Sequence, residues 1–231
     1  MNIYLKEDQI ATENLVPGKR VYGEQLFKEK LDVSEDSSEN ISELEAKQVE
    51  YRLWNPRRSK LAAAFLNGLS KLQIANDSKI LYLGASTGTT VSHISDIAKD
   101  GLIYAVEFSP VSMRKLNRLS ENRPNIVPLL VDATKPKEYL NLIEKVDFIY
   151  CDVAQPNQTD AFIQNIKLFL KEDSLAMIMI KSRSIDVNQK PKKIFKQEEE
   201  KLIAKGIGVI EKIKLEPYEK DHIAFLVQEK F

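Results

Sequence analysis

The sequence has few cysteines, no net charge and no long apolar run. Cys151 is the single cysteine in 231 residues, which excludes an internal disulfide and a zinc site built from a cysteine cluster. Lysine plus arginine and aspartate plus glutamate both number 34, so the formal net charge is zero. Proteins that bind nucleic acid unaided are usually more basic. Any nucleic-acid contact must therefore come from a local basic patch or be left to partners.

The apolar runs stay well short of the roughly 20 residues that cross a bilayer. The start of the chain, MNIYLKEDQI, lacks the apolar core of a signal peptide. A single cysteine also fits a reducing compartment. We therefore expect a soluble, cytoplasmic protein, and the sequence suggests no metal site.

The composition changes after residue 53. Before it, short β-like pieces at 2–5, 9–12 and 20–26 are separated by turn residues such as Pro17 and Gly18. The acidic, serine-rich stretch 32–40 is typical of a solvated loop. These features predict a small antiparallel β domain over 1–53 and a second domain over 54–231.

From Trp54 onward, strand-like and helix-like patterns alternate. Strands are expected at 79–83, 102–107, 126–131, 146–151, 175–180, 208–215 and 222–228. Helices are expected at 57–69, 91–98, 111–120, 137–143, 159–169 and 194–205. Repeated βα units predict an α/β fold with a doubly wound, mostly parallel sheet of seven strands. Five strands should be parallel, and the last two should close the sheet as a hairpin.

A glycine loop, LYLGASTGTT (81–90), follows the first strand of this domain. Gly84 and Gly88 lack the spacing of the dinucleotide fingerprint, and no Gly-Lys-Ser/Thr sequence of a phosphate-binding loop follows them. Glycine at the carboxyl end of a strand lets the backbone turn and a ligand approach closely. Taken alone, the loop could equally be a tight strand-to-helix turn.

Three carboxylates stand at the ends of three further strands. Glu107 ends the second strand, Asp132 with Ala133 ends the third, and Asp152 follows the fourth. An acid about 20 residues after a glycine loop often holds ribose hydroxyls, and Asp132 could accept hydrogen bonds from an adenine amino group. Each acid alone is explained by helix capping or solvation, but together with the loop they favour a nucleoside ligand.

Four polar residues far apart in the chain should meet at the same edge of the sheet. Lys60 begins the helix before the first strand, Asp152 and Lys181 end two strands, and His222 begins the antiparallel last strand. Methyl transfer to a sugar hydroxyl needs a base, and a desolvated lysine or one beside another cation can serve. Which group takes the proton is left open. Singly, Lys60 could be a solvated helix lysine and His222 a structural strand residue.

Several runs of the sequence resemble the fibrillarin family. They are YRLWNP (51–56), RSKLAAA (58–64), LYLGA (81–85), GTTVSHISD (88–96), YAVEFS (104–109), DVAQP (152–156) and LEPYE (215–219), followed by Asp221-His222. The resemblance implies a class I S-adenosylmethionine-dependent methyltransferase that modifies ribose 2′-hydroxyls of rRNA and tRNA within a guide-RNA-directed box C/D ribonucleoprotein. With eight glycines, the chain lacks the glycine- and arginine-rich tail of the eukaryotic form and is similar to the archaeal form.

The resemblance also implies site residues and partners. Cofactor contacts are expected at Gly84, Ala85, Gly88, Thr89, Thr90, Glu107, Phe108, Asp132, Ala133, Asp152, Val153, Ala154 and Gln155, and the catalytic set falls on Lys60, Asp152, Lys181 and His222. The implied partners are guide and target RNA, a Nop-domain scaffold protein and a kink-turn-binding protein. RNA contacts are expected from Arg52, Arg57, Arg58 and Arg183.

Two other functions stay open at this point. The same cofactor site could serve a protein methyltransferase, for example one acting on glutamine. A scaffold that binds the cofactor without catalysis is the other alternative, although such a module has no need for four polar groups at the same edge.

Overall fold

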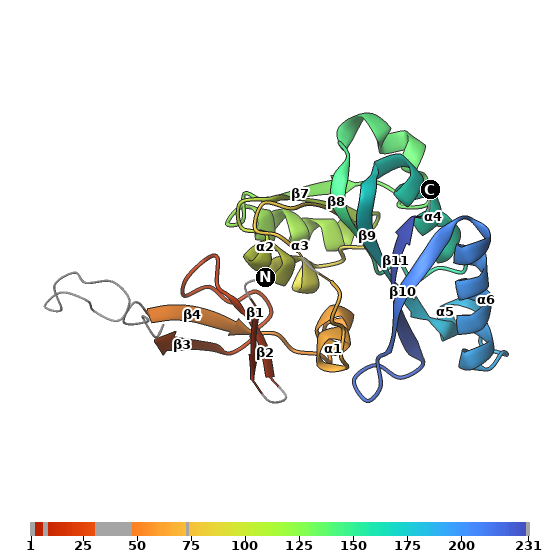
Figure 1. Ribbon diagram of the computed structural model, residues 1–231. Helices are drawn as coiled ribbons and strands as arrows, with labels where there is room; N and C mark the ends of the chain where they lie inside the picture. Colours follow the sequence, from red (N-terminus) through yellow and green to blue (C-terminus); the bar gives the residue numbers. More distant parts are fainter. Residues whose placement is uncertain (1–2, 7–8, 31–47, 73, 230–231) are drawn as a thin grey trace, which may run out of the picture.

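The chain forms two sheets, seen in a computed structural model that describes residues 3–6, 9–30, 48–72 and 74–229 (Figure 1). The smaller sheet is antiparallel, has the order β1-β2-β4-β3 and lies before Trp54. Its strands are β1 (Ile3–Lys6), β2 (Gln9–Glu13), β3 (Leu26–Lys30) and β4 (Gln48–Leu53).

The larger sheet has seven strands in the order β10-β11-β9-β8-β5-β6-β7. The strands are β5 (Lys79–Leu83), β6 (Leu102–Glu107), β7 (Ile126–Leu130), β8 (Val146–Cys151), β9 (Leu170–Lys181), β10 (Ile207–Lys214) and β11 (His222–Glu229). Strands β5 to β9 are mutually parallel, whereas β11 is antiparallel to both β9 and β10. This arrangement confirms the predicted fold class, including the antiparallel closing hairpin.

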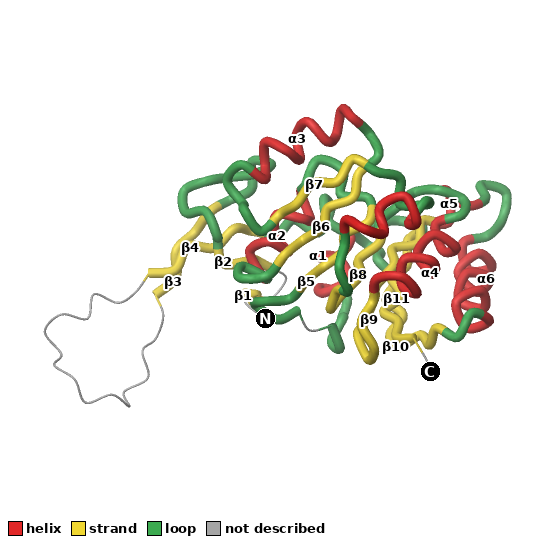
Figure 2. Tube along the Cα trace, turned by 90° about the horizontal axis from the view of Figure 1, so that it is seen from above, coloured by secondary structure: helices red, strands yellow, loops and turns green. Residues whose placement is uncertain are grey.

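Helices cover both faces of the larger sheet, as Figures 1 and 2 show. Alternate strand residues point to opposite faces, so Ile80 and Tyr82 belong to one buried cluster, and Leu81 and Leu83 to the other. The first cluster is covered by α1 (Lys60–Leu66), α2 (Thr89–Ile97) and α3 (Pro110–Ser120), and the second by α4 (Gln158–Phe169), α6 (Pro191–Ala204) and the short η1 (Pro136–Leu142). The four-residue α5 (Ser182–Ile185) follows β9. Among the described helices, none is long and apolar enough to cross a membrane.

The N-terminal sheet differs in detail from the prediction. The third strand begins at Leu26 and does not span 20–26, because the Glu24 carboxylate accepts backbone N–H groups from Val21 and Tyr22 and holds this segment in a turn. Strand β4 was not predicted. The acidic stretch 32–40 lies outside the described residues.

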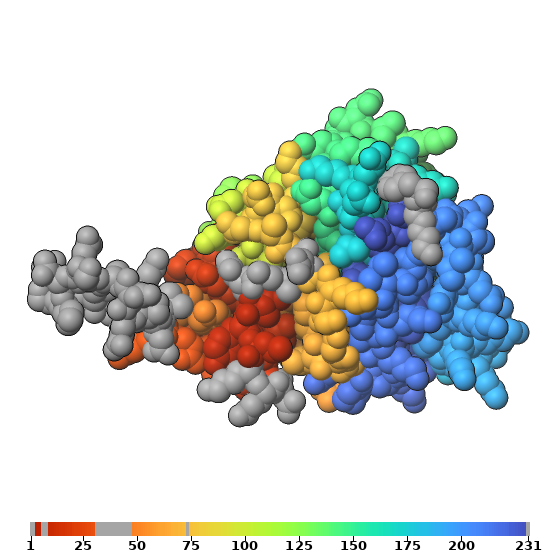
Figure 3. Space-filling view, viewed as in Figure 1, coloured from red at the N-terminus to blue at the C-terminus, as the bar shows by residue number. Residues whose placement is uncertain are grey.

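The two sheets are joined by a buried polar network beside α1 and α2, where Figure 3 shows the N-terminal sheet packed against the flank of the larger body. Arg52 on β4 is fully buried and pairs with Glu24 at 2.7 Å and with Asp96 of α2 at 2.8 Å. The prediction that Arg52 contacts RNA is therefore wrong, because its guanidinium is consumed by internal carboxylates. The division into domains 1–53 and 54–231 stays a prediction.

Candidate active site

The glycine loop turns sharply where β5 ends. Gly84 has a φ of 85°, in the left-handed region that favours glycine. A Cβ on Gly84 would lie 2.8 Å from the backbone oxygen of Asp152, so a side chain there would push β5 and β8 apart. The backbone N–H of Ser86 donates to Glu107 at 2.8 Å, which fixes the loop to the end of β6. Gly84 thus keeps the strand ends close and the space beside them open.

Gly88 has another role. It has a φ of 92° and precedes α2, but its Cβ position is blocked by the side chain of Leu119 on α3. Among the predicted cofactor residues, Gly88 alone lines neither of the two cavities described below. Its missing side chain serves the packing of α2 on α3, so its expected cofactor contact is not supported.

The first cavity lies beyond the ends of β5, β6, β7 and β8 and has a volume of about 210 Å³. Predicted cofactor residues line most of it, namely Gly84, Glu107, Phe108, Asp132, Ala133, Asp152, Val153, Ala154 and Gln155. The ring of Phe108 is 65% exposed, so a ligand could cover it. Ser86 also lines this cavity, and sequence reasoning missed it because nothing distinguishes a serine in a loop.

The second cavity adjoins the first and has a volume of about 290 Å³. The two cavities share Gly84, Ser86 and Asp152. The remaining residues of the second are Arg58, Lys60, Tyr82, Ala85, Thr87, Thr89 and Thr90. Tyr82 and Thr87 were not predicted, since a tyrosine inside an apolar strand carries no signal beyond core packing.

Lys60 and Asp152 meet inside the second cavity. Ser59 caps α1 by accepting from the N–H of Ala62, so the helix begins at Lys60 and not at residue 57. This start places the ammonium of Lys60 2.5 Å from Oδ1 of Asp152. Both side chains are about one-fifth exposed, at 21% and 20%, so the pair faces the cavity and not bulk solvent. A carboxylate and an ammonium are therefore fixed where the two cavities join.

His222 and Lys181 lie opposite each other on β11 and β9 at the same edge. Neither residue lines the two cavities, and Lys181 is exposed. Burial lowers the pKa of His222 below its ordinary value of 6.5, and the nearby charge of Lys60 lowers it further. Nδ1 lies 2.7 Å from the carbonyl oxygen of Lys220, which can only accept. The neutral imidazole therefore keeps its lone pair on Nε2.

The remaining predicted arginines are at the surface. Arg58 lines the second cavity and stands 5.1 Å over the ring of Tyr22, whereas Arg57 lies 6.0 Å from the ring centroid of Tyr218. Arg183 donates to the carboxylate of Asp221 at 3.1 Å. Their contacts with RNA stay predictions.

Comparison with known proteins identifies the family. The Fibrillarin family model matches residues 1–231. The fibrillarin-like rRNA/tRNA 2′-O-methyltransferase of Methanothermobacter thermautotrophicus is 48% identical over 226 residues, which cover 98% of this chain and 93% of that protein. Aeropyrum pernix fibrillarin, solved with natively bound S-adenosyl-L-methionine, is 42% identical with a TM-score of 0.80 and covers 95% of this chain and 88% of its own.

A fibrillarin/Nop5p complex contains a chain that is 39% identical, with a TM-score of 0.83, over 99% of this chain and 97% of that chain. A putative caffeoyl-CoA O-methyltransferase of Staphylococcus aureus, at 18% identity and a TM-score of 0.52, shares the fold alone. The full-length family match and the identity over nearly the whole chain agree with the glycine loop and the strand-end carboxylates. The chain belongs to the fibrillarin family.

Proposed function

We propose that this chain is an S-adenosylmethionine-dependent RNA ribose 2′-O-methyltransferase and the catalytic subunit of a guide-RNA-directed box C/D ribonucleoprotein. The observation that carries the proposal is the pair of adjoining cavities. One is bounded by the glycine loop and strand-end carboxylates, and the other holds the Lys60–Asp152 ion pair. A methyl donor and an acceptor hydroxyl can thus approach each other from two sides of Asp152.

The residues of the first cavity fit S-adenosylmethionine. The space that a Cβ of Gly84 would fill is left open, and Glu107 and Asp132 offer carboxylate oxygens to ribose hydroxyls and to an amino group. The exposed ring of Phe108 offers an apolar surface to a base. When bound, the cofactor supplies a methyl group carried on a sulfonium. Relatives in this family are named for methylation of rRNA and tRNA, which are the substrates proposed here.

The second cavity takes the acceptor ribose in this proposal. Asp152 accepts from Lys60, so the ammonium is held in place and can donate to an oxygen of the ribose. As the new oxygen–carbon bond forms and the sulfur–carbon bond breaks, the hydroxyl proton goes to Nε2 of His222, directly or through one water molecule. Lys60 is a poorer acceptor, because the contact with Asp152 favours its charged form. Lys181 adds positive charge at the same edge.

The proposal includes partners. A relative forms a complex with Nop5p, so we expect this chain to bind a Nop-domain scaffold protein. Guide RNA would select the target nucleotide by base pairing, and a kink-turn-binding protein would hold the guide. Delegated selection suits a chain whose net charge is zero. rRNA and tRNA are intracellular, so we propose the cytoplasm as its location.

Labelled S-adenosylmethionine tests this function. The chain is incubated with a target RNA in the presence or absence of guide RNA and the two protein partners. Label on RNA only in the complete mixture supports the proposal. Label on protein without RNA would identify a protein methyltransferase, and cofactor binding without any transfer would identify a scaffold.

A further inference from the structure

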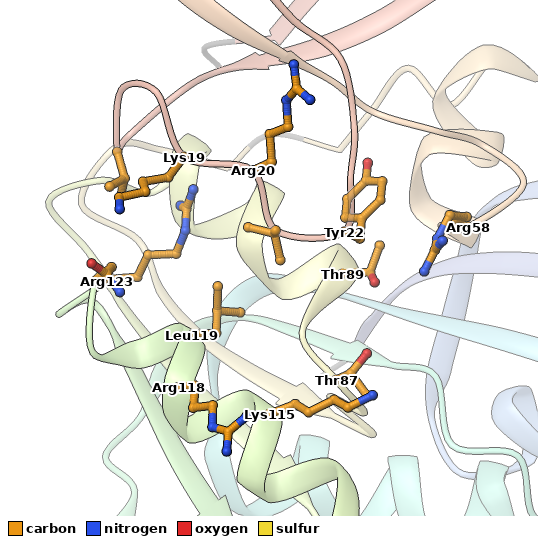
Figure 4. A pocket seen from close by; sticks show the side chains of 13 residues that line it. Lys19, Arg20, Tyr22, Arg58, Thr87, Thr89, Lys115, Arg118, Leu119 and Arg123 are labelled. Atoms are coloured by element: carbon orange, nitrogen blue, oxygen red, sulfur yellow. The ribbon is translucent and has the colours of Figure 1, made fainter.

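A third cavity, of about 510 Å³, lies between the N-terminal sheet and α3. Figure 4 shows the basic side chains around it, with Lys19 and Arg20 on the N-terminal loop, Lys115 and Arg118 on α3, and Arg58 at one end. We call this cavity the basic groove. Its lining consists of Val16, Lys19, Arg20, Val21, Tyr22, Arg58, Thr87, Thr89, Lys115, Arg118, Leu119, Asn122 and Arg123.

The charge of the basic groove is one-sided. Its lining includes lysines and arginines from three separate segments but no aspartate or glutamate, although the whole chain has zero net charge. Lys19, Arg20, Lys115 and Arg118 form no ion pair with any carboxylate of the described residues. All four are exposed. Unpaired cations that face one another repel, so this arrangement is favourable only when an anion lies between them.

Arg123 at the base of the groove shows the same unmet demand. It is 1% exposed, and Nη1 donates to Asp96 at 2.6 Å and to Ser95 at 3.1 Å. Nη2 is buried and has no hydrogen-bond partner among the described residues. A buried guanidinium normally satisfies all of its donors. Nη2 is therefore a donor available to an acceptor that enters the groove.

The basic groove continues into the second cavity. Arg58, Thr87 and Thr89 line both spaces, so a chain lying in the groove leads to the Lys60–Asp152 pair. The contact of Arg58 with the ring of Tyr22 at 5.1 Å holds its guanidinium at the junction. The cofactor cavity opens into the second cavity from the other side. The order of the three spaces is thus cofactor, reacting group, basic groove.

We propose that the basic groove binds the sugar–phosphate backbone of the RNA strand whose ribose is methylated, next to the target nucleotide. This inference rests on the proposed function. Cations on several segments along a groove suit a linear polyanion better than a single phosphate, which would occupy only two or three of them. The lining is rich in cations and hydroxyls, which bind phosphates of any sequence. The groove therefore adds affinity and alignment and leaves the choice of nucleotide to base pairing.

Two matched double variants test the groove. Lys115→Gln/Arg118→Gln removes two charges from it, and Lys167→Gln/Lys205→Gln removes two charges from exposed positions of α4 and the end of α6 that line none of the three cavities. The dissociation constant of a labelled single-stranded RNA oligonucleotide is measured against the full chain. Each lost phosphate contact reduces the salt slope by about 0.7, so wild type should lose about sevenfold more affinity than the groove variant between roughly 50 and 200 mM salt.

The control variant should retain the wild-type salt slope, and both variants should bind S-adenosylmethionine as wild type does, which shows that they are folded. Equal slopes for the groove and control variants would overturn the proposal. It would also be overturned if sodium phosphate at constant ionic strength displaced the RNA, because the groove would then be a small-anion site. In the assembled ribonucleoprotein, undiminished methylation by the groove variant would refute the groove alone, whereas no ribose methylation by wild type would refute the proposed function.

Discussion

Asp152 is the residue at which the two halves of the site meet. Its backbone oxygen faces the open side of Gly84, and its carboxylate holds Lys60 at 2.5 Å. Sequence reasoning could place it there, because residues that follow parallel strands gather at one edge of the sheet. The same reasoning could not find Tyr82, whose position in an apolar strand predicts only burial.

Replacing Asp152 with asparagine should remove most of the activity. Asp152→Asn keeps the size of the side chain but loses the charge that orients Lys60, so we expect the single-turnover rate at saturating cofactor to fall by about 100-fold or more. Asp147→Asn is the matched control, since Asp147 begins the same strand and also holds a lysine, Lys171, at 2.5 Å. Equal rates for Asp152→Asn and the control would remove Asp152 from the mechanism.

His222 gives the reaction a specific pH dependence. A base must be neutral to accept a proton, and burial lowers the pKa of His222 below 6.5. The transfer rate should therefore be level between about pH 7 and 8 and decline about tenfold per pH unit once the pH falls below that pKa. A pH–rate profile of the assembled enzyme measures this, and His222→Gln should lower the plateau and remove the acidic decline. A decline that persists in His222→Gln would assign the base to another group.

At the scale of elements, β4 and α2 are linked through buried charges. Arg52 of β4 lies between Glu24 and Asp96, and Arg123 also donates to Asp96, so one α2 carboxylate serves two guanidinium groups. His93, one turn earlier on α2, stacks on Trp54 at 4.8 Å. The sequence did not predict this network, because an arginine in a short polar strand looks exposed and its partner is 44 residues away.

Removing Arg52 should destabilise the whole fold. Arg52→Ala leaves two buried carboxylates short of a partner, and we expect the free energy of unfolding to drop by about 3–5 kcal/mol in urea titrations. Arg57→Ala is the control, because Arg57 is exposed and should change this free energy by no more than about 0.5 kcal/mol. A loss below about 1 kcal/mol for Arg52→Ala would contradict the role assigned to the network.

The larger sheet was more predictable than the smaller one. Its central strands are buried on both faces and appear as continuous apolar runs between helical patterns, which fixes their number and direction. Strands β3 and β4 are partly exposed, at the edge or on the outer side of a small sheet, and carry charged residues at several positions. Such strands lack a clear alternation, so a tertiary contact, here the Glu24 turn, decides where they begin.

At the scale of the whole molecule, three cavities follow one another along one side. They run from the carboxyl edge of the larger sheet to the N-terminal sheet, and the charges along them change from carboxylates in the first to lysines and arginines in the third. A chain with zero net charge can thus present a cation-binding end and an anion-binding end. The sequence gave the carboxylates but not the third cavity, because Lys19, Arg58 and Arg118 come together only through the packing of the two sheets.

The most direct test of this account is the chemical position of the transferred methyl group. A ribose 2′-O-methyl blocks the hydroxyl that attacks the neighbouring phosphate in alkali, so the bond after a methylated nucleotide survives hydrolysis. Target RNA labelled by the complete assembly with wild-type chain is hydrolysed in alkali and its products are separated. We predict that the label stays in an alkali-resistant dinucleotide. Label released with single nucleotides, or found on protein, would contradict the account.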